Sequence, residues 1–231
     1  MARIRKRNTT RLEIVQLASE LFLTEGYSNT SIKKIGEELE MSSGHVIFYF
    51  PTKDHLLAAL VEMLCDFQWK MMKSVVEDGN TSILAVCLEF AIMTSMCEEN
   101  EIARDFYVST YSSPVTLDII RKNDSRRAKM VFEEYCHSWS DEQFSEAEIL
   151  VSGIEYSTLV KTSDPVPVES RIRGALNSIL SIYGVPQDIR EKKIEKALRF
   201  DYQSQGKKVF GEFIKYVEMT NDQAIEDLLT S

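Results

Sequence analysis

Most side chains in this sequence that are able to do chemistry are too scattered to act together. The histidines and cysteines match neither the spacing of a zinc site nor a Cys-x-x-Cys pair. The chain contains neither a glycine-rich phosphate loop nor a Gly-x-Ser-x-Gly turn. These absences predict a protein that is not an enzyme and holds no metal or cofactor. The residues concerned are His45, His55, His137, Cys65, Cys87, Cys97 and Cys136.

One short stretch, SSGHVIFY at residues 42–49, is richer in binding chemistry. It combines small and hydrogen-bonding side chains with aromatic rings. In a helix, Val46 and Phe50 share one face. A short helix with such residues at its exposed start is typical of one that enters the DNA major groove. The residues expected to face outward are Ser43, Gly44, His45, Phe48 and Tyr49.

Two short helices joined by a tight turn must position this stretch. Ile32, Ile35 and Leu39 are three and four residues apart, so they share one face of the first helix. The turn is residues 40–42, and Ser42 can cap the second helix by accepting a hydrogen bond from a free backbone N–H. Pro51 ends that helix because the residue before a proline avoids helical backbone.

This segment resembles the DNA-binding domain of the TetR family of bacterial transcriptional regulators. The matching positions are Thr30, Ile35, Gly36, Met41, Ser42, Gly44, Val46, Ile47, Tyr49, Phe50 and Lys53. The resemblance starts near Thr10 and covers about the first quarter of the chain. It implies an all-α fold, with a three-helix helix-turn-helix domain in residues 1–51. It also implies a C-terminal helical bundle in residues 52–231 for ligand binding and dimerisation.

The segment departs from the family pattern in three ways. Glu40 stands where a turn glycine is usual, which adds negative charge and predicts a different backbone conformation. Val46-Ile47 replaces the usual Leu-Tyr pair, so one phenol that would contact a phosphate is missing. Ser43 and His45 stand where lysine or threonine is frequent. We therefore expect an operator sequence and an affinity that the family does not specify.

The composition fits a helical protein of ordinary hydrophobicity. The 231 residues include nine glycines and five prolines, with 44 % hydrophobic and 27 % charged residues. No apolar run is long enough to span a membrane, and no apolar segment follows the basic start MARIRKRN. We therefore expect a cytoplasmic protein with reduced, mostly buried cysteines. A redox-sensing cysteine remains the alternative.

The charge is distributed unevenly along the chain. The net charge is −9, but residues 1–60 hold eight basic and seven acidic residues, so the remainder carries −10. Five basic residues and no acidic residue occur in the first eleven positions. Arg3, Arg5 and Lys6 therefore form a cationic arm that is expected to reach DNA phosphates or a minor groove. A solubilising tail is the alternative.

Helical periodicity and breakers predict the remaining elements. Thr10 and Glu13 have capping-box spacing at the start of a first helix that ends at Gly26. Thr30 is expected to cap the next helix. Thr52 is expected to cap the long helix that links the two domains. Further helices are predicted at residues 81–98, 114–136, 141–162 and 168–183, with turns at residues 78–80 and 163–167.

Methionine and aromatic residues concentrate between residues 67 and 111. Such soft side chains can line an apolar ligand pocket, although they can equally form bundle core. The family resemblance favours a pocket for an inducer. Because no charged cluster is evident in the sequence, an apolar or aromatic molecule is expected. The predicted ligand-binding residues are Phe67, Met71, Phe90, Met93, Phe106, Tyr107 and Tyr111.

The late helices have two possible roles. By resemblance, residues 141–162 and 168–184 form a four-helix homodimer interface, where Gly153, Gly174 and Ala175 would allow close approach. Alternatively, both helices complete the core of one subunit. The tail at 186–231 is expected to pack on the bundle, extend the dimer surface or cover the pocket.

The resemblance implies a ligand-responsive, homodimeric repressor that leaves a near-palindromic DNA operator when an inducer binds. Bases or sugars would be contacted by Ser43, His45, Phe48 and Tyr49, while the phosphates would be held by Thr30, Ser42, Lys53 and the arm. One alternative is a helical interaction protein that has kept the motif but lost specific DNA binding. A helical enzyme that uses an apolar pocket is the other, less favoured alternative.

Overall fold

The computed structural model describes residues 2–77, 81–161, 163 and 166–230, with backbone alone at 2–6 and 229–230. This part of the chain forms helices and contains no strand, which confirms the all-α prediction. The predicted turn at 78–80 lies outside the described residues, as do residues 162, 164 and 165 of the second predicted break. The helices are α1 (Ala2–Thr24), α2 (Ile32–Glu38), α3 (Ser43–Tyr49), α4 (Lys53–Glu77), α5 (Ser82–Glu99), α6 (Glu101–Ser112), α7 (Pro114–Val131), α8 (Asp141–Leu159), α9 (Val168–Ile182), α10 (Gln187–Leu198) and α11 (Tyr202–Thr230).

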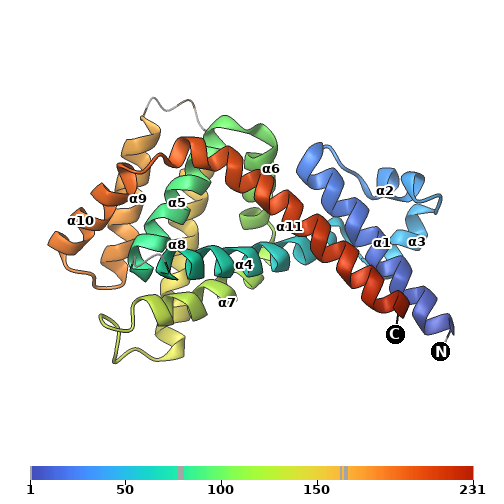
Figure 1. Ribbon diagram of the computed structural model, residues 1–231, viewed down its shortest axis with the longest axis horizontal. Coiled ribbons are helices and arrows are strands. Elements are labelled where there is room, and N and C mark those ends of the chain that lie inside the picture. The colour runs from blue at the N-terminus through green and yellow to red at the C-terminus, as the bar shows by residue number, and fades with distance from the viewer. Residues whose placement is uncertain (1, 78–80, 162, 164–165, 231) are drawn as a thin grey trace.

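Helices α1 to α3 form a small unit at one end of the molecule (Figure 1). Its buried side chains include Ile14 and Phe22 of α1, Ile35 of α2, and Val46 and Phe50 at α3. Helix α1 begins at Ala2, so the expected start near Thr10 is wrong. The basic N-terminal segment therefore continues the backbone of α1 instead of forming a separate arm.

The bundle is built around α5. Thr81 caps this helix by accepting a hydrogen bond from the backbone N–H of Leu84. Apolar residues occupy most sides of α5, and it packs against α4, α6, α8, α9, α10 and α11. Helix α4 runs from the N-terminal unit through the bundle, where α7 lies along it (Figure 1). A helix that is apolar on most sides is stable only inside such a bundle.

Helix α11 connects the two parts of the molecule. It starts beside α5 and then runs along α1, so the described chain ends lie close together (Figure 1). In the bundle, the Phe213 ring lies 5.4 Å from the Phe67 ring and 5.9 Å from the Phe106 ring. Near the N-terminal unit, Nε2 of Gln16 donates to Oδ1 of Asp222 over 2.6 Å. The tail thus packs on the bundle, which is one of the three alternatives that the sequence left open. It also packs on α1.

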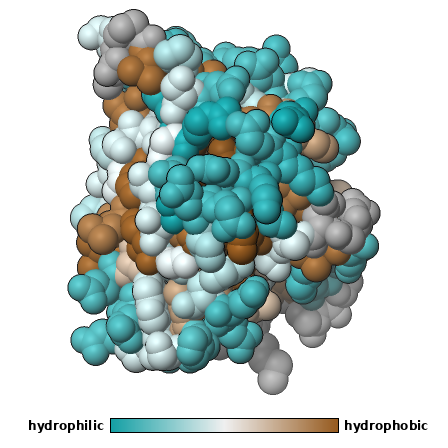
Figure 2. All heavy atoms as spheres, turned by 90° about the vertical axis from the view of Figure 1, so that its left-hand side faces the viewer, coloured by the Kyte–Doolittle hydropathy of each residue, from teal (hydrophilic) through white to brown (hydrophobic). Residues whose placement is uncertain are grey.

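The end of the bundle farthest from α1 is mostly hydrophilic (Figure 2). Helix α10 lies at this end and is highly charged, and its Ile194 is buried. Phe200, just after the helix, is 51 % exposed. Helix α10 therefore covers the bundle with a narrow apolar stripe and leaves its charged face in solvent.

Two predicted helix ends are wrong. Helix α7 ends at Val131 instead of near Cys136, and the chain turns at Phe132, whose ring stacks on Tyr183 at 4.1 Å. Helix α8 ends at Leu159, three residues before the predicted end. The early end of α7 is stabilised by the stacking of Phe132 on Tyr183, because this contact buries two large rings against each other.

The four cysteines are buried and unpaired. Burial raises the pKa of Cys65, Cys87 and Cys97 to about 12. Such thiols stay protonated and unreactive at neutral pH, which agrees with the prediction of reduced core thiols. Within the described ranges, no helix is long and apolar enough to cross a membrane.

Candidate functional site

Helix α3 is locked in place from its inner face and its start. Oγ of Ser42 accepts a hydrogen bond from the backbone N–H of His45 over 3.2 Å, which confirms the predicted cap. Val46 is 0 % and Phe50 is 3 % exposed. A β-carbon at Gly36 would lie 2.8 Å from the carbonyl oxygen of Met41, so α2 and the turn before α3 approach each other too closely for any larger residue. This packing fixes the direction in which α3 presents its outer face.

The outer face of α3 is aromatic and exposed. Phe48 is 67 % exposed, and its ring lies 5.2 Å from that of Tyr49. The His45 ring lies 5.6 Å from the same tyrosine ring. The guanidinium carbon of Arg7, on α1, lies 5.8 Å from the Phe48 ring centre. A cation from α1 thus stands beside the face that the sequence predicted to be outward.

Ser43, Gly44 and Ile47 complete this face. Gly44 is exposed and Ser43 is partly exposed at the helix start. Ile47 is 47 % exposed, so the residue that replaces the family's tyrosine presents an apolar side chain to solvent. The side chains of Arg3, Arg5 and Lys6 lie outside the described residues, although the backbone there is helical.

Lys53 has partners within the protein, which the sequence did not suggest. Its Nζ donates to the carbonyl oxygens of Tyr27 at 2.9 Å and Thr30 at 3.0 Å. The same ammonium lies 3.8 Å from the Tyr27 ring centre, and the Tyr27 hydroxyl donates to Asp54. Lys53 therefore joins the start of α4 to the loop between α1 and α2. In this conformation its ammonium is engaged there instead of being free to meet a phosphate.

The expected roles of Thr30 and Thr52 are also not met. Thr30 is 1 % exposed, and its hydroxyl donates to the Gly26 carbonyl over 2.9 Å. The cap of α2 is Ser31, whose Oγ accepts from the Lys34 backbone N–H. The Thr52 hydroxyl contacts Nδ1 of His55 at 2.8 Å. A buried threonine cannot reach a phosphate, so Thr30 supports the loop from within.

Glu40 adopts the backbone conformation that a glycine would adopt. Its φ of 54° is the only positive value at a non-glycine residue in the described part of the chain. The expectation of a different turn conformation is therefore wrong. The left-handed conformation costs a residue with a β-carbon about 1 kcal/mol or more. The turn keeps its shape at this cost, and an exposed carboxylate lies next to α3.

A cavity of about 60 Å³ lies inside the bundle, far along the chain from α3. Three of the seven predicted ligand residues line it: Phe90, Met93 and Tyr111. The other four predicted residues do not line it: Phe67, Met71, Phe106 and Tyr107. Of these, Phe67 and Phe106 pack against Phe213 of α11 instead. The full lining is Gln68, Val86, Glu89, Phe90, Met93, Tyr111, Asp124, Arg127, Ala128, Val131, Phe132, Glu148, Val151, Glu155, Leu176, Ile179 and Tyr183.

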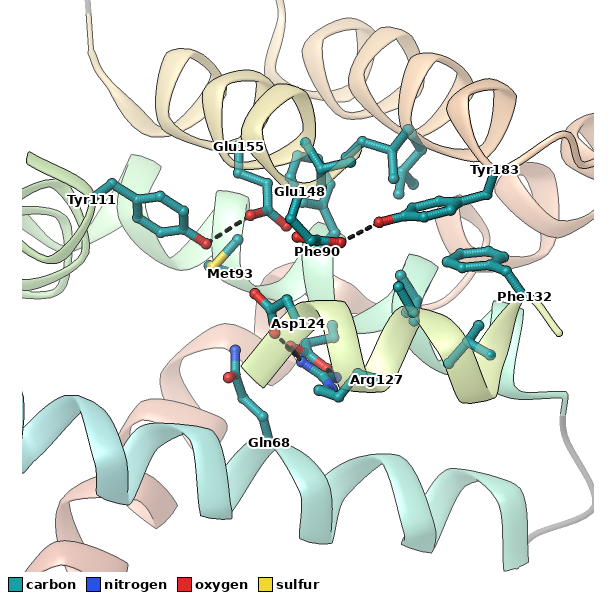
Figure 3. A pocket seen from close by; sticks show the side chains of 17 residues that line it. Gln68, Phe90, Met93, Tyr111, Asp124, Arg127, Phe132, Glu148, Glu155 and Tyr183 are labelled. Carbon is teal, nitrogen blue, oxygen red and sulfur yellow. Dashed lines mark hydrogen bonds and ion pairs between the residues drawn. The ribbon is translucent and has the colours of Figure 1, made fainter. Parts of the chain in front are cut away.

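The cavity contains a cluster of charged residues, so the expectation of an uncharged pocket is wrong. Arg127 of α7 donates from Nη1 to Oε1 of Glu89 over 3.1 Å and from Nη2 to the other carboxylate oxygen. Asp124 lies 3.4 Å from the same Nη1. Opposite them, Glu148 and Glu155 project from α8 toward the cavity (Figure 3).

Two tyrosines hold the carboxylates of α8. The Tyr183 hydroxyl donates to Glu148, and the Tyr111 hydroxyl donates to Oε2 of Glu155 over 2.9 Å (Figure 3). Burial raises the pKa of Glu148 to about 8, and it also raises the pKa of Glu155 and of Asp124. The sequence contained a signal for this pair, since residues seven apart lie on one helical face.

The described residues contain no group of three or more His, Cys, Asp and Glu side chains that could hold a metal ion. His137 is exposed, as is His55 near the start of α4.

Comparison with known proteins bears on the N-terminal unit. Residues 14–60 match the family described as "Bacterial regulatory proteins, tetR family". Over these residues the chain is similar to the tetR family. The match spans the described α2 and α3, the C-terminal part of α1 and the first residues of α4. It therefore includes the capped helix α3 and the residues that bury its inner face.

A curated relative is similar to this chain over part of its length. The chain is 24 % identical over 106 residues to the uncharacterized HTH-type transcriptional regulator YuxN of Bacillus subtilis (strain 168). That match covers 46 % of this chain and 36 % of the relative, so the chain spans about a third of the relative's length. Two crystal structures of a gamma-butyrolactone receptor (ArpA-like protein) have TM-scores of 0.47 and 0.44 at 17 % identity and cover 87 % of this chain.

Proposed function

We propose that this protein is a DNA-binding transcriptional regulator of the TetR family that acts as a repressor. In this proposal a homodimer binds a near-palindromic operator and leaves it when a small molecule occupies the bundle cavity. The observation that carries the proposal is the rigid presentation of α3: its inner residues Val46 and Phe50 are buried, its start is capped by Ser42, and its outer face is exposed. Specific readout of bases requires this combination of fixed backbone and free side chains.

The assigned contacts follow from exposure. His45, Phe48 and Tyr49, with Ser43, would face base edges and sugars, and Gly44 would let the helix backbone approach closely. Arg7 stands beside Phe48 and would reach a phosphate, together with Arg3, Arg5 and Lys6 at the start of α1. Ser42 would contribute its backbone near the helix N-terminus, where phosphate is attracted. Thr30 and Lys53 are left out because the protein itself occupies their polar groups.

The proposed dimer uses α8 and α9. Ile149 and Leu150 of α8 are 54 % and 59 % exposed, and Tyr156 on the same side of the helix is 39 % exposed. Gly153 lies between them, and a β-carbon there would meet no described atom within 4 Å. This open apolar stripe is the kind of surface that a second copy buries. Two copies of α3 would then enter successive major grooves of the operator.

The test is binding of the purified protein to its own upstream DNA, titrated at two salt concentrations against random DNA. A preference for upstream DNA of about a thousandfold or more at the higher salt supports the proposal. His45→Ala should reduce this preference, while His137→Ala, which removes an exposed histidine of the bundle, should leave it unchanged. Binding that ignores sequence and vanishes with salt would refute the assignment.

A second candidate is a helical interaction protein that has lost specific DNA binding. Two exposed residues favour it: Ile47 offers no hydrogen bond, and Glu40 places a negative charge beside α3. This candidate predicts equal, weak binding to upstream and random DNA. It also predicts no effect of His45→Ala on either.

A further inference from the structure

We propose that the bundle cavity binds a small organic cation of the amine or amidine class, held by Glu148 and Glu155 between aromatic rings. The binding site itself stands on the geometry of the cavity, and only its regulatory effect rests on the proposed function. The volume of about 60 Å³ is less than half of the roughly 150 Å³ of an engineered cavity that binds benzene. A cation of a few heavy atoms therefore fits, whereas a ligand with an aromatic ring would have to displace side chains.

The cavity has more acidic groups than internal cations can neutralise. Four carboxyl groups line it, and Arg127 is the guanidinium that lines it with them. Arg127 already donates to both oxygens of Glu89 and lies within 3.4 Å of Asp124. Glu148 and Glu155 are held instead by neutral tyrosine hydroxyls. The side of the cavity formed by α8 is therefore left without a positive charge of its own among the lining residues.

An orphaned oxygen points to the missing partner. Glu148 is 2 % exposed, and its Oε2 has no hydrogen-bond partner among the residues that the structure describes. Its other oxygen, Oε1, is the one bonded to Tyr183. A buried acceptor of this kind is stabilised by a donor, and a charged N–H donor is the strongest that a ligand can bring.

The rest of the wall suits an organic cation. The rings of Phe90, Phe132, Tyr111 and Tyr183 line the same cavity, and Figure 3 shows the two tyrosines on either side of the α8 carboxylates. Aromatic rings attract a cation through their negative faces, and more strongly once water is excluded. An anionic ligand would instead meet carboxyl groups from α5, α7 and α8. Nη1 and Nη2 of the lining guanidinium already donate to Glu89, and its Nε is the nitrogen left without a partner among the described residues.

The test compares ligands that have the same shape and different charge. Acetamidine, acetamide and acetate are titrated by calorimetry at pH 8, with methylamine and methanol as a smaller pair. We expect acetamidine to bind at least about tenfold more tightly than acetamide, because one charge-assisted hydrogen bond is worth that much. Acetate should not bind. Magnesium chloride at equal concentration tests whether a simple metal ion takes the same place.

Matched variants locate the site. Glu148→Gln and Glu155→Gln should each weaken acetamidine binding by about tenfold or more while leaving weak acetamide binding unchanged. Glu146→Gln, an exposed carboxylate on the same helix, should have no effect. Circular dichroism of each variant shows whether the helices are retained.

Four results would overturn the proposal. These are equal binding of charged and neutral ligands, cation binding unaffected by Glu148→Gln together with Glu155→Gln, binding of magnesium alone, or no saturable binding of either organic cation. The DNA experiment is separate. If the protein binds acetamidine but no operator, the cation site stands and the proposed function fails. If it binds operator but no cation, the proposed function stands and the cation site fails.

Discussion

The free energy of unfolding should fall as the pH rises, because of the buried carboxyl group of Glu148. Burial raises the pKa of this group from its ordinary 4.5 to about 8. Between these two values the folded protein keeps a proton that the unfolded chain has released. The resulting stabilisation is fully present below pH 4.5 and is lost as the pH rises through 8.

The expected size follows from these two pKa values. Each pH unit between them removes about 1.4 kcal/mol from the free energy of unfolding. Raising the pH from 6 to 8 should therefore remove about 2 kcal/mol, allowing for half-titration of the folded protein at pH 8. Other groups around the cavity titrate too, so the comparison must be made against a variant. The charged and titratable groups that act on Glu148 or share its cavity are Glu89, Tyr111, Arg121, Asp124, Arg127, Glu155 and Tyr183.

The assay is urea denaturation at pH 6 and pH 8, followed by circular dichroism, for wild type and two variants. Glu148→Gln keeps the shape and the acceptor for Tyr183 but cannot ionise. Its stability should fall by about 2 kcal/mol less than that of wild type between the two pH values. Glu146→Gln, which changes an exposed carboxylate of α8, should behave as wild type. Parallel pH dependences for wild type and Glu148→Gln, with equal denaturant slopes, would refute the reasoning.

Three further variants test the turn, the loop anchor and the dimer. Glu40→Gly relieves the left-handed conformation at φ 54° and should raise the free energy of unfolding by about 0.5 to 1 kcal/mol; a decrease in urea denaturation would contradict this. Lys53→Met leaves the Tyr27 and Thr30 carbonyls without their donor and should cost about 1 to 3 kcal/mol, whereas Lys33→Met, on the surface, should cost much less; equal losses would refute the anchor. Leu150→Asp should give a monomer in size-exclusion chromatography with light scattering, while the similarly exposed Met130→Asp should stay dimeric; a dimeric Leu150→Asp would place the interface elsewhere.

Local signals in the sequence were sufficient for the helix-turn-helix. Ser42, Val46 and Phe50 act over three or four residues, so the cap and the buried face of α3 follow from helical geometry alone. The same holds for the helix predicted at residues 81–98, which is α5. These predictions were confirmed because each depends on neighbours within one turn of helix.

Where a local signal was not used, tertiary packing decided. Thr30 was expected to cap α2, but it is buried against the Gly26 carbonyl and the cap is the next residue, Ser31. Thr10 offered a start for α1, yet the helix continues back to Ala2, where the end of α11 runs alongside it. A helix that is covered by a neighbour can extend past a capping signal, because packing contributes more than the cap.

The sequence by itself determined the resemblance of the N-terminal segment to the tetR family, the all-helical class and the outward face of α3. The partners of Lys53, which lie 23 and 26 residues before it, were decided only by the tertiary structure. The structure alone also brought Glu89, Arg127 and Glu148 of α5, α7 and α8 around one cavity. The physical reason is distance along the chain: periodicity reports which face of a helix is buried, whereas the charges that meet inside a bundle depend on how separate helices pack.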